Sequence, residues 1–447
     1  MPSFREDSFL IVQPGSQNTL VRFGIEDTLS PPAYSIPTKV YRNASDPSLY
    51  TINGQDESLA VYPIVAGDIV DVNGLNFLLK CIVRSILKNH PVLLLNSIAF
   101  TLVQTSNRWS SDAIENITKY VFESLQFGAF SVVPASLSSM FAYGSLANAC
   151  VVDIGFEKTE VTPILDYQVY IPGIKIIDKG GNTINTKLAK SLPSLSSEQV
   201  EFLKRSSIFE VLSEEDASKS FFGSEQLVEK KEDDEGVLDV AAIVTSEKST
   251  REILAEKERE KRKQGKAAAE SKPNSELETN TFVDASGTAI AIGKERFQGC
   301  TELIASVATA IHRTLGKITD LKRAQECYDN IILVGQTTKI HGFKEALMVY
   351  MYTNFVVGQG AVQGGAFRPD TTNLIQDLNL IQVPKHVKFL NRPDYFSEWK
   401  KAGFEDCSFL GAQILAKQVF GSHSVGGSFA REEYLEKGPI GIWHNRL

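Results

Sequence analysis

The sequence lacks the features that mark several common classes of protein. None of its five cysteines belongs to a CxxC pair, and none of its six histidines pairs with a Cys or His at metal-binding spacing. No run of about eighteen apolar residues occurs, and the polar residues 1–7 are not followed by the apolar core of a signal peptide. We therefore expect no metal site, no secretion and no membrane span.

An excess of positive charge is also missing. The 46 Lys and Arg residues face 54 Asp and Glu residues, which gives a net charge of -8. A chain with this balance is not, as a whole, a basic nucleic-acid binder. Its hydrophobic fraction of 43% and charged fraction of 22% are those of an ordinary soluble globular protein. The scattered cysteines favour reduced thiols in a reducing compartment.

Short apolar runs and one helical pattern predict the main elements of the fold. The helix is expected at 111–125, with Ser110 or Ser111 as its N-cap. Strands mixed with helices in this way indicate an α/β protein whose sheets are covered. The strands are expected at 8–12, 19–25, 92–95, 149–154, 158–165 and 330–334.

Two segments differ in composition from the rest of the chain. Residues 225–236 are dense in acid, and residues 250–270 are dense in Lys, Arg, Glu and Ala, which is typical of a solvated helix. We interpret both as parts of an exposed charged insertion at about 213–275. The basic run at 257–266 leaves a contact with DNA or with an acidic partner open. Residues 357–372 are rich in glycine and predict a surface loop.

Residues 151–157 have the frame of a phosphate-binding hairpin with altered side chains. A short apolar strand delivers Asp153 and then Gly155. Phe156 stands where a second carboxylate is expected, and Glu157 stands where a second glycine would let the backbone approach phosphate oxygens. A carboxylate that faces phosphate repels it unless a cation lies between them.

The chain resembles the actin-related proteins, within the actin, Hsp70 and sugar-kinase superfamily. The matches are spread in order along the sequence, at 4–5, 62–70, 90–94, 121–123, 153–163, 296–300, 334–347 and 432–439. The resemblance implies an α/β, actin-like fold with two large lobes of mixed sheets and helices around a central cleft. It places the first lobe at 1–134, with an outer loop at about 38–62, and the second lobe at 135–330. Residues 331–447 would then carry the adenosine-side motif, the Gly-rich loop and the return to the first lobe.

The same resemblance assigns positions in the cleft. Gln13 stands where an aspartate would organise the metal, Ala135 where a glutamine would orient water, and Glu160 where a histidine would lie near that water. Phe156 replaces a carboxylate, and Gln336 replaces a glycine. The resemblance therefore implies a degenerate nucleotide cleft formed by Gln13, Gly15, Ser16, Ala135, Asp153, Gly155, Phe156, Gly335, Gln336 and Thr337.

These replacements predict a protein that is not an enzyme. Phosphoryl transfer needs a held metal, an oriented nucleophile and neutralised charge, and the loss of one electrostatic contact costs roughly 10²–10³ in rate. We expect no cofactor. Binding of ATP without turnover stays open, because Asp153, Gly155, Gly335 and Thr337 remain, although such glycines serve equally well in tight turns.

The resemblance also implies partners. It indicates a nuclear subunit of a chromatin-remodelling complex of the SWI/SNF or RSC type, paired with a second actin-related protein. This subunit would bind the helical (HSA) arm of the motor ATPase and regulate remodelling and transcription. The alternatives are a nucleotide-binding switch and a filament former. The helix would lie in a groove lined by Phe141, Ala142, Gly144, Tyr167, Leu410, Ile414 and Leu415, of which the last three have a spacing that is also typical of ordinary core.

Overall fold

The chain folds into two compact units. The computed structural model describes residues 4–26, 28–144, 146–222, 273–356, 384–421 and 426–445. Unit 1 comprises Met1–Thr186, Cys300–Lys339 and Leu347–Leu447, and unit 2 comprises Lys187–Gly299 and Ile340–Ala346. Most of the predicted charged insertion, its basic run at 257–266 and the Gly-rich loop at 357–372 lie outside the described residues.

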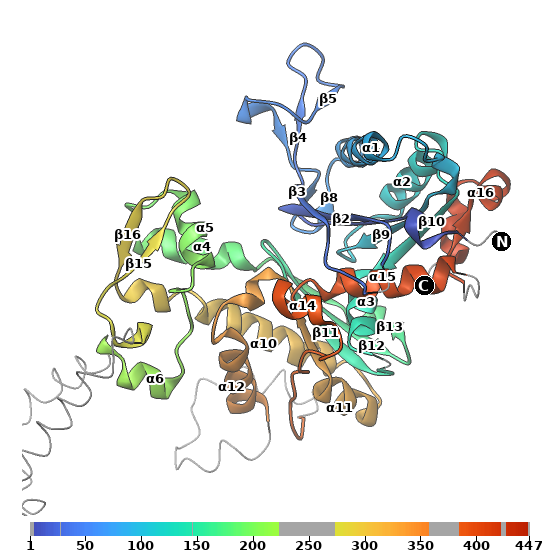
Figure 1. Cartoon of the computed structure of the whole chain (residues 1–447). Coiled ribbons are helices and arrows are strands. Elements are labelled where there is room, and N and C mark those ends of the chain that lie inside the picture. Colours follow the sequence, from blue (N-terminus) through green and yellow to red (C-terminus); the bar gives the residue numbers. More distant parts are fainter. Residues whose placement is uncertain are drawn as a thin grey trace, which may run out of the picture. The chain divides into compact units, whose positions relative to one another are not determined.

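Unit 1 contains a six-stranded sheet that is covered on both faces. Its strand order is β18-β10-β9-β1-β2-β3, with β1 parallel to β9 and antiparallel to β2. Figure 1 shows α1 and α2 on one side of this sheet and α3 and α15 on the other. The elements are β1 (Phe9–Pro14), β2 (Asn18–Phe23), β3 (Tyr34–Pro37), β9 (Ala99–Gln104), β10 (Ala129–Pro134), β18 (Phe429–Ala430), α1 (Val72–Asn89), α2 (Ser111–Glu123), α3 (Ala135–Ala142) and α15 (Cys407–Phe420).

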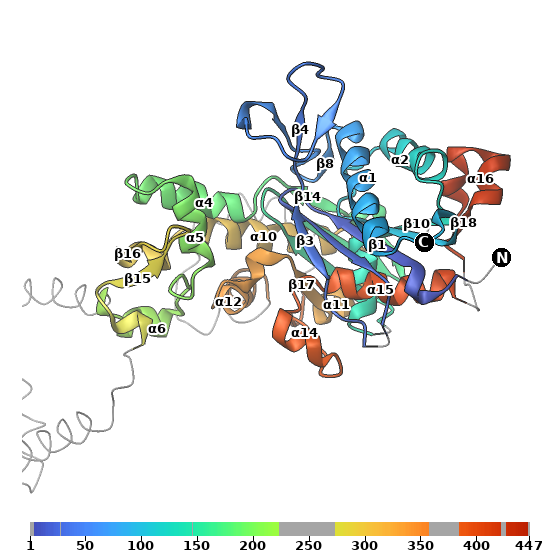
Figure 2. The same ribbon diagram turned by 45° about the horizontal axis from the view of Figure 1, so that its top comes forward.

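Alternation along β1 explains why both faces are covered. Leu10 and Val12 pack into the apolar cluster under α1 and α2, whereas Phe9 and Ile11 pack into the cluster under α3 and α15. Successive side chains of a strand point to opposite faces, so an unbroken apolar run fits a sheet with two cores. The tilted view in Figure 2 shows α1 and α2 side by side along this sheet.

A second, five-stranded sheet completes the core of unit 1. Its order is β13-β12-β11-β17, and β14 pairs with β12. Helices α10 and α11 and the other face of α3 contact its strands. The elements are β11 (Ala149–Ile154), β12 (Thr159–Leu165), β13 (Gln168–Val169), β14 (Lys175–Ile177), β17 (Ile331–Val334), α10 (Thr301–Leu315) and α11 (Leu321–Asp329).

Smaller elements complete both units. In unit 1, β4 (Val40–Arg42), β5 (Tyr50–Thr51) and β6 (Ala60–Val61) form a three-stranded sheet, and β7 (Ile64–Val65) and β8 (Asp68–Ile69) form a hairpin. Unit 2 contains α5 (Ser197–Arg205), α6 (Glu214–Lys219), β15 (Asn280–Val283) and β16 (Ala289–Ile292). The other helices among the described residues are α4 (Gly181–Ser191), α12 (Phe343–Phe355), α14 (Ser397–Ala402) and α16 (Arg431–Lys437). Short 3-10 turns include η3 (Leu95–Ser97), η7 (Gln336–Lys339) and η9 (Pro439–Asn445).

The predicted helix at 111–125 is confirmed, because α2 spans Ser111–Glu123 and Ser110 caps it by accepting a hydrogen bond from the Ala113 amide. The strand predicted at 92–95 is wrong. Helix α1 ends at Asn89, and the chain turns at Pro91 and again in η3 before β9 begins at Ala99. Val92 is 89% exposed, so this apolar run lies on the surface. Among the described residues, no helix has the length and apolar character needed to cross a membrane.

Candidate functional site

Four residues of the predicted cleft lie together at the ends of β11 and β17. Gly335 follows β17 with a φ of +95°, and a Cβ built on it would lie 2.3 Å from the carbonyl oxygen of Ile154. The Thr337 hydroxyl donates a hydrogen bond to the Gly155 carbonyl at 3.0 Å. Asp153, Gly155, Gly335 and Thr337 therefore form one closely packed junction, which only a residue without a side chain fits at position 335.

The two glutamines of the predicted cleft are bound by one segment at the start of α15. Gln13, near the end of β1, accepts a hydrogen bond from the Ser408 hydroxyl at 3.1 Å. Gln336 donates its side-chain amide to Asp406. Burial raises the pKa of the Asp406 carboxyl, and the hydrogen bond from Gln336 opposes this rise. Both replacements are thus satisfied by side chains of the protein itself.

The remaining predicted cleft residues take ordinary places in the backbone. The Gly15 amide donates to the Asn18 carbonyl at 2.9 Å, which closes the β1–β2 turn that also contains Ser16. Ala135 begins α3 directly after β10 and packs against the apolar cluster under α3 and α15. The carbonyl of Phe156 accepts a hydrogen bond from the Asn182 amide at 2.7 Å.

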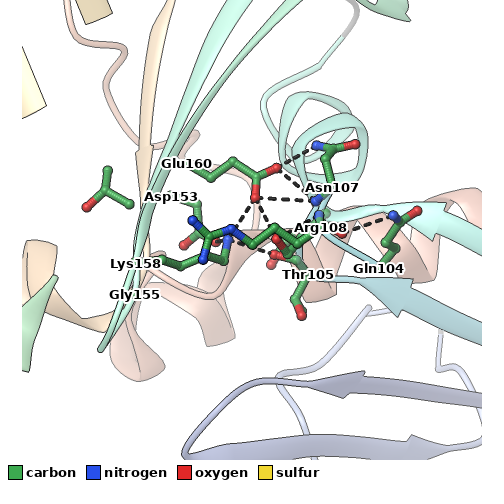
Figure 3. A network of polar contacts seen from close by, with 12 residues as sticks. Gln104, Thr105, Asn107, Arg108, Asp153, Gly155, Lys158 and Glu160 are labelled. Carbon is green, nitrogen blue, oxygen red and sulfur yellow. Dashed lines mark hydrogen bonds and ion pairs between the residues drawn. The ribbon is translucent and has the colours of Figure 1, made fainter. Parts of the chain in front are cut away.

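The side chain at the centre of this region is that of Lys158, which was not among the predicted cleft residues. Figure 3 shows its ammonium group among oxygens from both sheets of unit 1. Lys158 Nζ lies 2.9 Å from Glu160 Oε2, 3.0 Å from the carbonyl oxygen of Thr105 and 3.6 Å from Asp153 Oδ2. The side chains of Lys158 and Glu160 are only 8% and 6% exposed. One feature of the sequence could have indicated this pair. Lys158 and Glu160 are two residues apart at the start of a predicted strand, and this spacing puts both side chains on the same face.

Glu160 is bound on its other side by the segment that follows β9. Ser106 Oγ donates to Glu160 Oε2 at 2.9 Å, and Asn107 donates to Glu160 Oε1 with its side-chain Nδ2 at 2.5 Å and its backbone amide at 3.2 Å. Burial alone would raise the pKa of Glu160, but the charge of Lys158 and these hydrogen bonds outweigh burial and lower it. Burial raises the pKa of Asp153, against the opposing effect of Lys158. Lys158 and Glu160 therefore form a charged pair. Asp153 lies farther from the ammonium group, at 3.6 Å, and interacts with it less strongly.

The acidic side chains of this region already have a cation beside them. Groups of three or more His, Cys, Asp or Glu suited to a metal ion are absent from the described part of the chain. Lys158 already supplies the cation beside Asp153 and Glu160. A magnesium ion favours free carboxylates and water, and these two carboxylates have a protein partner instead.

The residues of the predicted helix groove divide into surface and interior. Tyr167 is 46% exposed, whereas Leu410 and Leu415 are 0% and 2% exposed. Ala142 is also buried, and Phe141 and Ile414 are half-buried against the same apolar cluster. Leu410 and Leu415 thus support this wall from inside and present no surface to a ligand.

An exposed tyrosine that is not among the predicted groove residues lies beside Gly144. Tyr395 is 70% exposed, and its hydroxyl would be 3.8 Å from a Cβ built on Gly144. Its ring contacts Phe396 at 5.0 Å between centroids, and Phe396 packs against the cluster that includes Leu410. Of the residues predicted to line the groove, Phe141, Gly144, Tyr167 and Ile414 are at least partly exposed, and Tyr395 is an exposed neighbour of Gly144.

Comparison with known proteins gives three findings. The family model described as actin matches residues 5–359. The chain is 26% identical, over 99% of its own length and 99% of the other, to a Schizosaccharomyces pombe protein named SWI/SNF and RSC complexes subunit arp9. A stretch of 101 residues, which is 22% of this chain and 24% of the other, is 36% identical to the actin-like protein ARP6 of Yarrowia lipolytica.

Proposed function

Because this chain belongs to the actin family, we propose that it acts as a non-catalytic subunit of a chromatin-remodelling complex in the nucleus. The observation that carries the proposal is the similarity to the fission yeast SWI/SNF and RSC subunit, which extends over 99% of both chains. A match of this length covers the surfaces of a protein as well as its core. We propose a complex of the same SWI/SNF or RSC type for this chain.

The contacts in the cleft support a role without catalysis. Gln13 and Gln336 are hydrogen-bonded to Ser408 and Asp406, and Lys158 is paired with Glu160. If a metal–nucleotide complex bound at these predicted cleft residues, it would compete with these contacts for the same side chains. We expect no release of phosphate from ATP, and we expect no binding of Mg-ATP at micromolar concentrations. Turnover combined with micromolar affinity in calorimetry would instead favour the nucleotide-switch alternative.

Two exposed tyrosines support the docking of a partner helix. Tyr167 and Tyr395 are both exposed, and the Tyr395 hydroxyl lies next to Gly144, where the absence of a side chain lets another chain approach closely. Aromatic anchors around a groove are typical of sites that receive an amphipathic helix. The occupant we propose is the helical arm of the motor ATPase, bound while a second actin-related protein lies next to this subunit.

The test is co-purification with a defined partner. The chain would be expressed with the helical arm of a remodelling ATPase from the same organism, with and without a second actin-related protein. Co-elution in size-exclusion chromatography is the expected result. A Tyr167→Ala/Tyr395→Ala double variant should bind the arm about tenfold more weakly or worse. The control is Tyr34→Ala, because Tyr34 is 56% exposed on β3, an edge strand of the six-stranded sheet.

The outcomes test two proposals separately, namely that the chain is a subunit of the complex and that the predicted groove binds the helical arm. Failure of the wild-type chain to retain the arm under either condition would count against the subunit proposal. Equal affinity of the wild-type chain and the double variant would leave the subunit proposal standing and remove the groove. A loss of binding in the Tyr34→Ala control would show that the assay reports folding and not the groove.

A further inference from the structure

The buried pair of Lys158 and Glu160 is one part of a network that joins three segments of unit 1. These segments are the β7–β8 turn, the residues directly after β9, and the hairpin between β11 and β12. We propose that the network is an internal latch. It fixes the two sheets of unit 1 to each other through side-chain and backbone contacts that need no bound ligand. This proposal does not depend on any partner. The latch comprises Ala66, Gly67, Thr105, Ser106, Asn107, Arg108, Asp153, Glu157, Lys158, Glu160 and Asp178.

Lys158 acts in this latch as a built-in cation. Two acidic side chains, Asp153 and Glu160, approach each other at the end of the second sheet, and both are close to Lys158 Nζ. Carboxylates gathered in a partly dry site need a positive charge nearby. The ammonium group supplies that charge and donates to the Thr105 carbonyl at 3.0 Å, which belongs to the segment after β9. The Lys158 side chain therefore balances the charge of two carboxylates on the second sheet. It also donates a hydrogen bond to the segment that follows β9 of the first sheet.

Glu160, which has the opposite charge, also contacts the segment that follows β9. Its two oxygens accept hydrogen bonds from the Ser106 hydroxyl and the Asn107 amide, both in the segment after β9. The Ser106 hydroxyl in turn accepts a hydrogen bond from the Arg108 amide at 3.2 Å. Contacts of both signs between the same two segments fix their register more firmly than one ion pair does.

The β7–β8 turn closes the network. The Ala66 amide donates to Glu157 Oε2 at 2.6 Å, and the Ala66 carbonyl accepts from Arg108 Nη1 at 3.0 Å. Arg108 Nη2 also reaches Asp178 Oδ1 at 2.6 Å, so this side chain contacts both the turn and the segment before α4. The amide and the carbonyl of Ala66 are thus bound by side chains from two different segments, the β11–β12 hairpin and the residues after β9.

The geometry of the turn indicates that these contacts are firm. Ala66 has a φ of +48°, a left-handed conformation that residues other than glycine adopt at a cost. Gly67 lies directly on the lysine stem, because a Cβ built on it would be 2.5 Å from Lys158 Cδ and Cε. A strained residue persists where its surroundings determine its conformation. The turn therefore rests on Lys158 and is held in place by Glu157 and Arg108.

Hydrogen–deuterium exchange of the full chain tests the latch. Glu157→Ala removes only the acceptor of the Ala66 amide, and Lys158→Met removes the cation while keeping the stem. Both should speed exchange in residues 64–69 by about tenfold or more, and Lys158→Met should do so in 104–108 as well. Exchange in α15 should stay unchanged. The control is Lys179→Met, which breaks a surface pair with Glu302 that has a distance of 3.0 Å.

Each result supports or overturns the latch. Unchanged exchange at 64–69 in both variants would overturn it. Slower exchange of the wild-type chain at 64–69 on addition of Mg-ATP would also overturn it, because the contacts would then need a ligand to form. Should Lys158→Met fail to fold, Glu157→Ala still decides, since Glu157 is not part of the buried pair. Recovery of slow exchange in a Lys158→Met/Glu160→Gln double variant, relative to Lys158→Met, would support charge compensation as the cause.

Discussion

Gly411 of α15 lies so close to Ser138 of α3 that a Cβ built on Gly411 would be 1.6 Å from the Ser138 carbonyl oxygen. This contact lets the two helices cross backbone against backbone, where α15 packs on the six-stranded sheet and α3 contacts strands of both sheets of unit 1. Leu410 and Ala412, on either side of Gly411, are completely buried in the cluster that also contains Leu137 and Met140 of α3. The helix crossing therefore sets the position of the half-buried Ile414 and of the wall above it.

Substitution of Gly411 by alanine should lower the free energy of unfolding by about 3 kcal/mol, because a methyl group there must push α15 away from α3. Tryptophan fluorescence during urea unfolding measures this effect. Trp109, Trp399 and Trp443 are the only tryptophans of the chain, and all lie in unit 1. The matched control is Gln418→Ala at an exposed position of the same helix. An unchanged unfolding midpoint in Gly411→Ala would mean that the helices are not this close.

Arg296 organises unit 2 in a way that a single substitution can reveal. Its side chain is fully buried and donates to carbonyl groups at Asn274, Leu277, Glu278, Ile292 and Gly293. The guanidinium group also lies 4.3 Å from the ring centroid of Phe297 and 5.7 Å from that of Phe222. It thereby joins residues that precede and follow the segment 223–272.

Arg296→Met should destabilise this part of unit 2, because several buried carbonyl groups lose their hydrogen-bond donor. Each carbonyl left unsatisfied lowers the free energy of unfolding by about 1–3 kcal/mol. We expect faster hydrogen exchange in β15 and β16, with an unchanged tryptophan transition because all tryptophans are in unit 1. Lys294→Met, at an exposed position two residues away, provides the control. Slow exchange in β15 and β16 of Arg296→Met would contradict this account.

The elements that could be predicted from sequence are those whose signals are local. A capping serine and helical spacing define α2 within a few residues, and apolar runs that end in Asp153 and Val334 define β11 and β17. The actin-like α/β fold predicted from scattered motifs is confirmed by the family match over residues 5–359. The apolar run after Pro91 misled the prediction because hydrophobicity alone does not show whether the chain turns.

The site was less accessible to sequence reasoning because its contacts are long-range. Lys158 meets Thr105, 53 residues earlier in the chain, and no local pattern gives that pairing. The helical spacing of Leu410 and Leu415 cannot distinguish residues that line a surface groove from residues that are buried in the core. The crossing at Gly411 decides between them, since it buries that face against α3. The roles assigned to Gln13, Ala135 and Phe156 remain predictions.

The cysteines provide a simple chemical test of the fold. All five are free thiols, and only Cys81 in α1 is not fully buried. Burial raises the pKa of the Cys81, Cys150, Cys327 and Cys407 thiols alike, so exposure and not pKa distinguishes Cys81 from the other thiols. An Ellman titration of the native protein should therefore detect one rapidly reacting thiol, and Cys81→Ser should abolish it. After denaturation, the wild-type chain should give all five. Two or more rapid thiols in the native protein would contradict the packing of the core.

His312 makes the stability of unit 1 depend on pH. The side chain is buried in α10, with Nδ1 3.0 Å from the Tyr328 hydroxyl and its ring stacked on Phe355. Burial, and to a smaller extent Arg313, lowers the pKa of His312 from 6.5 to about 4. Folding therefore expels a proton from this group. Its contribution to stability is complete above pH 6.5 and is lost as the pH falls towards 4.

Between pH 7 and pH 5, His312 should account for about 2 kcal/mol of lost unfolding free energy. His312→Asn keeps an acceptor near the Tyr328 hydroxyl and cannot titrate, so its tryptophan-detected urea midpoint should fall less than that of the wild-type chain over this range. His444→Asn removes an exposed histidine and should keep the wild-type slope. Parallel pH profiles for the wild-type chain and His312→Asn would show that His312 has an ordinary pKa in the folded protein. The difference between the profiles, not the absolute stability of either variant, carries the test, because the substitution also changes the packing against Phe355.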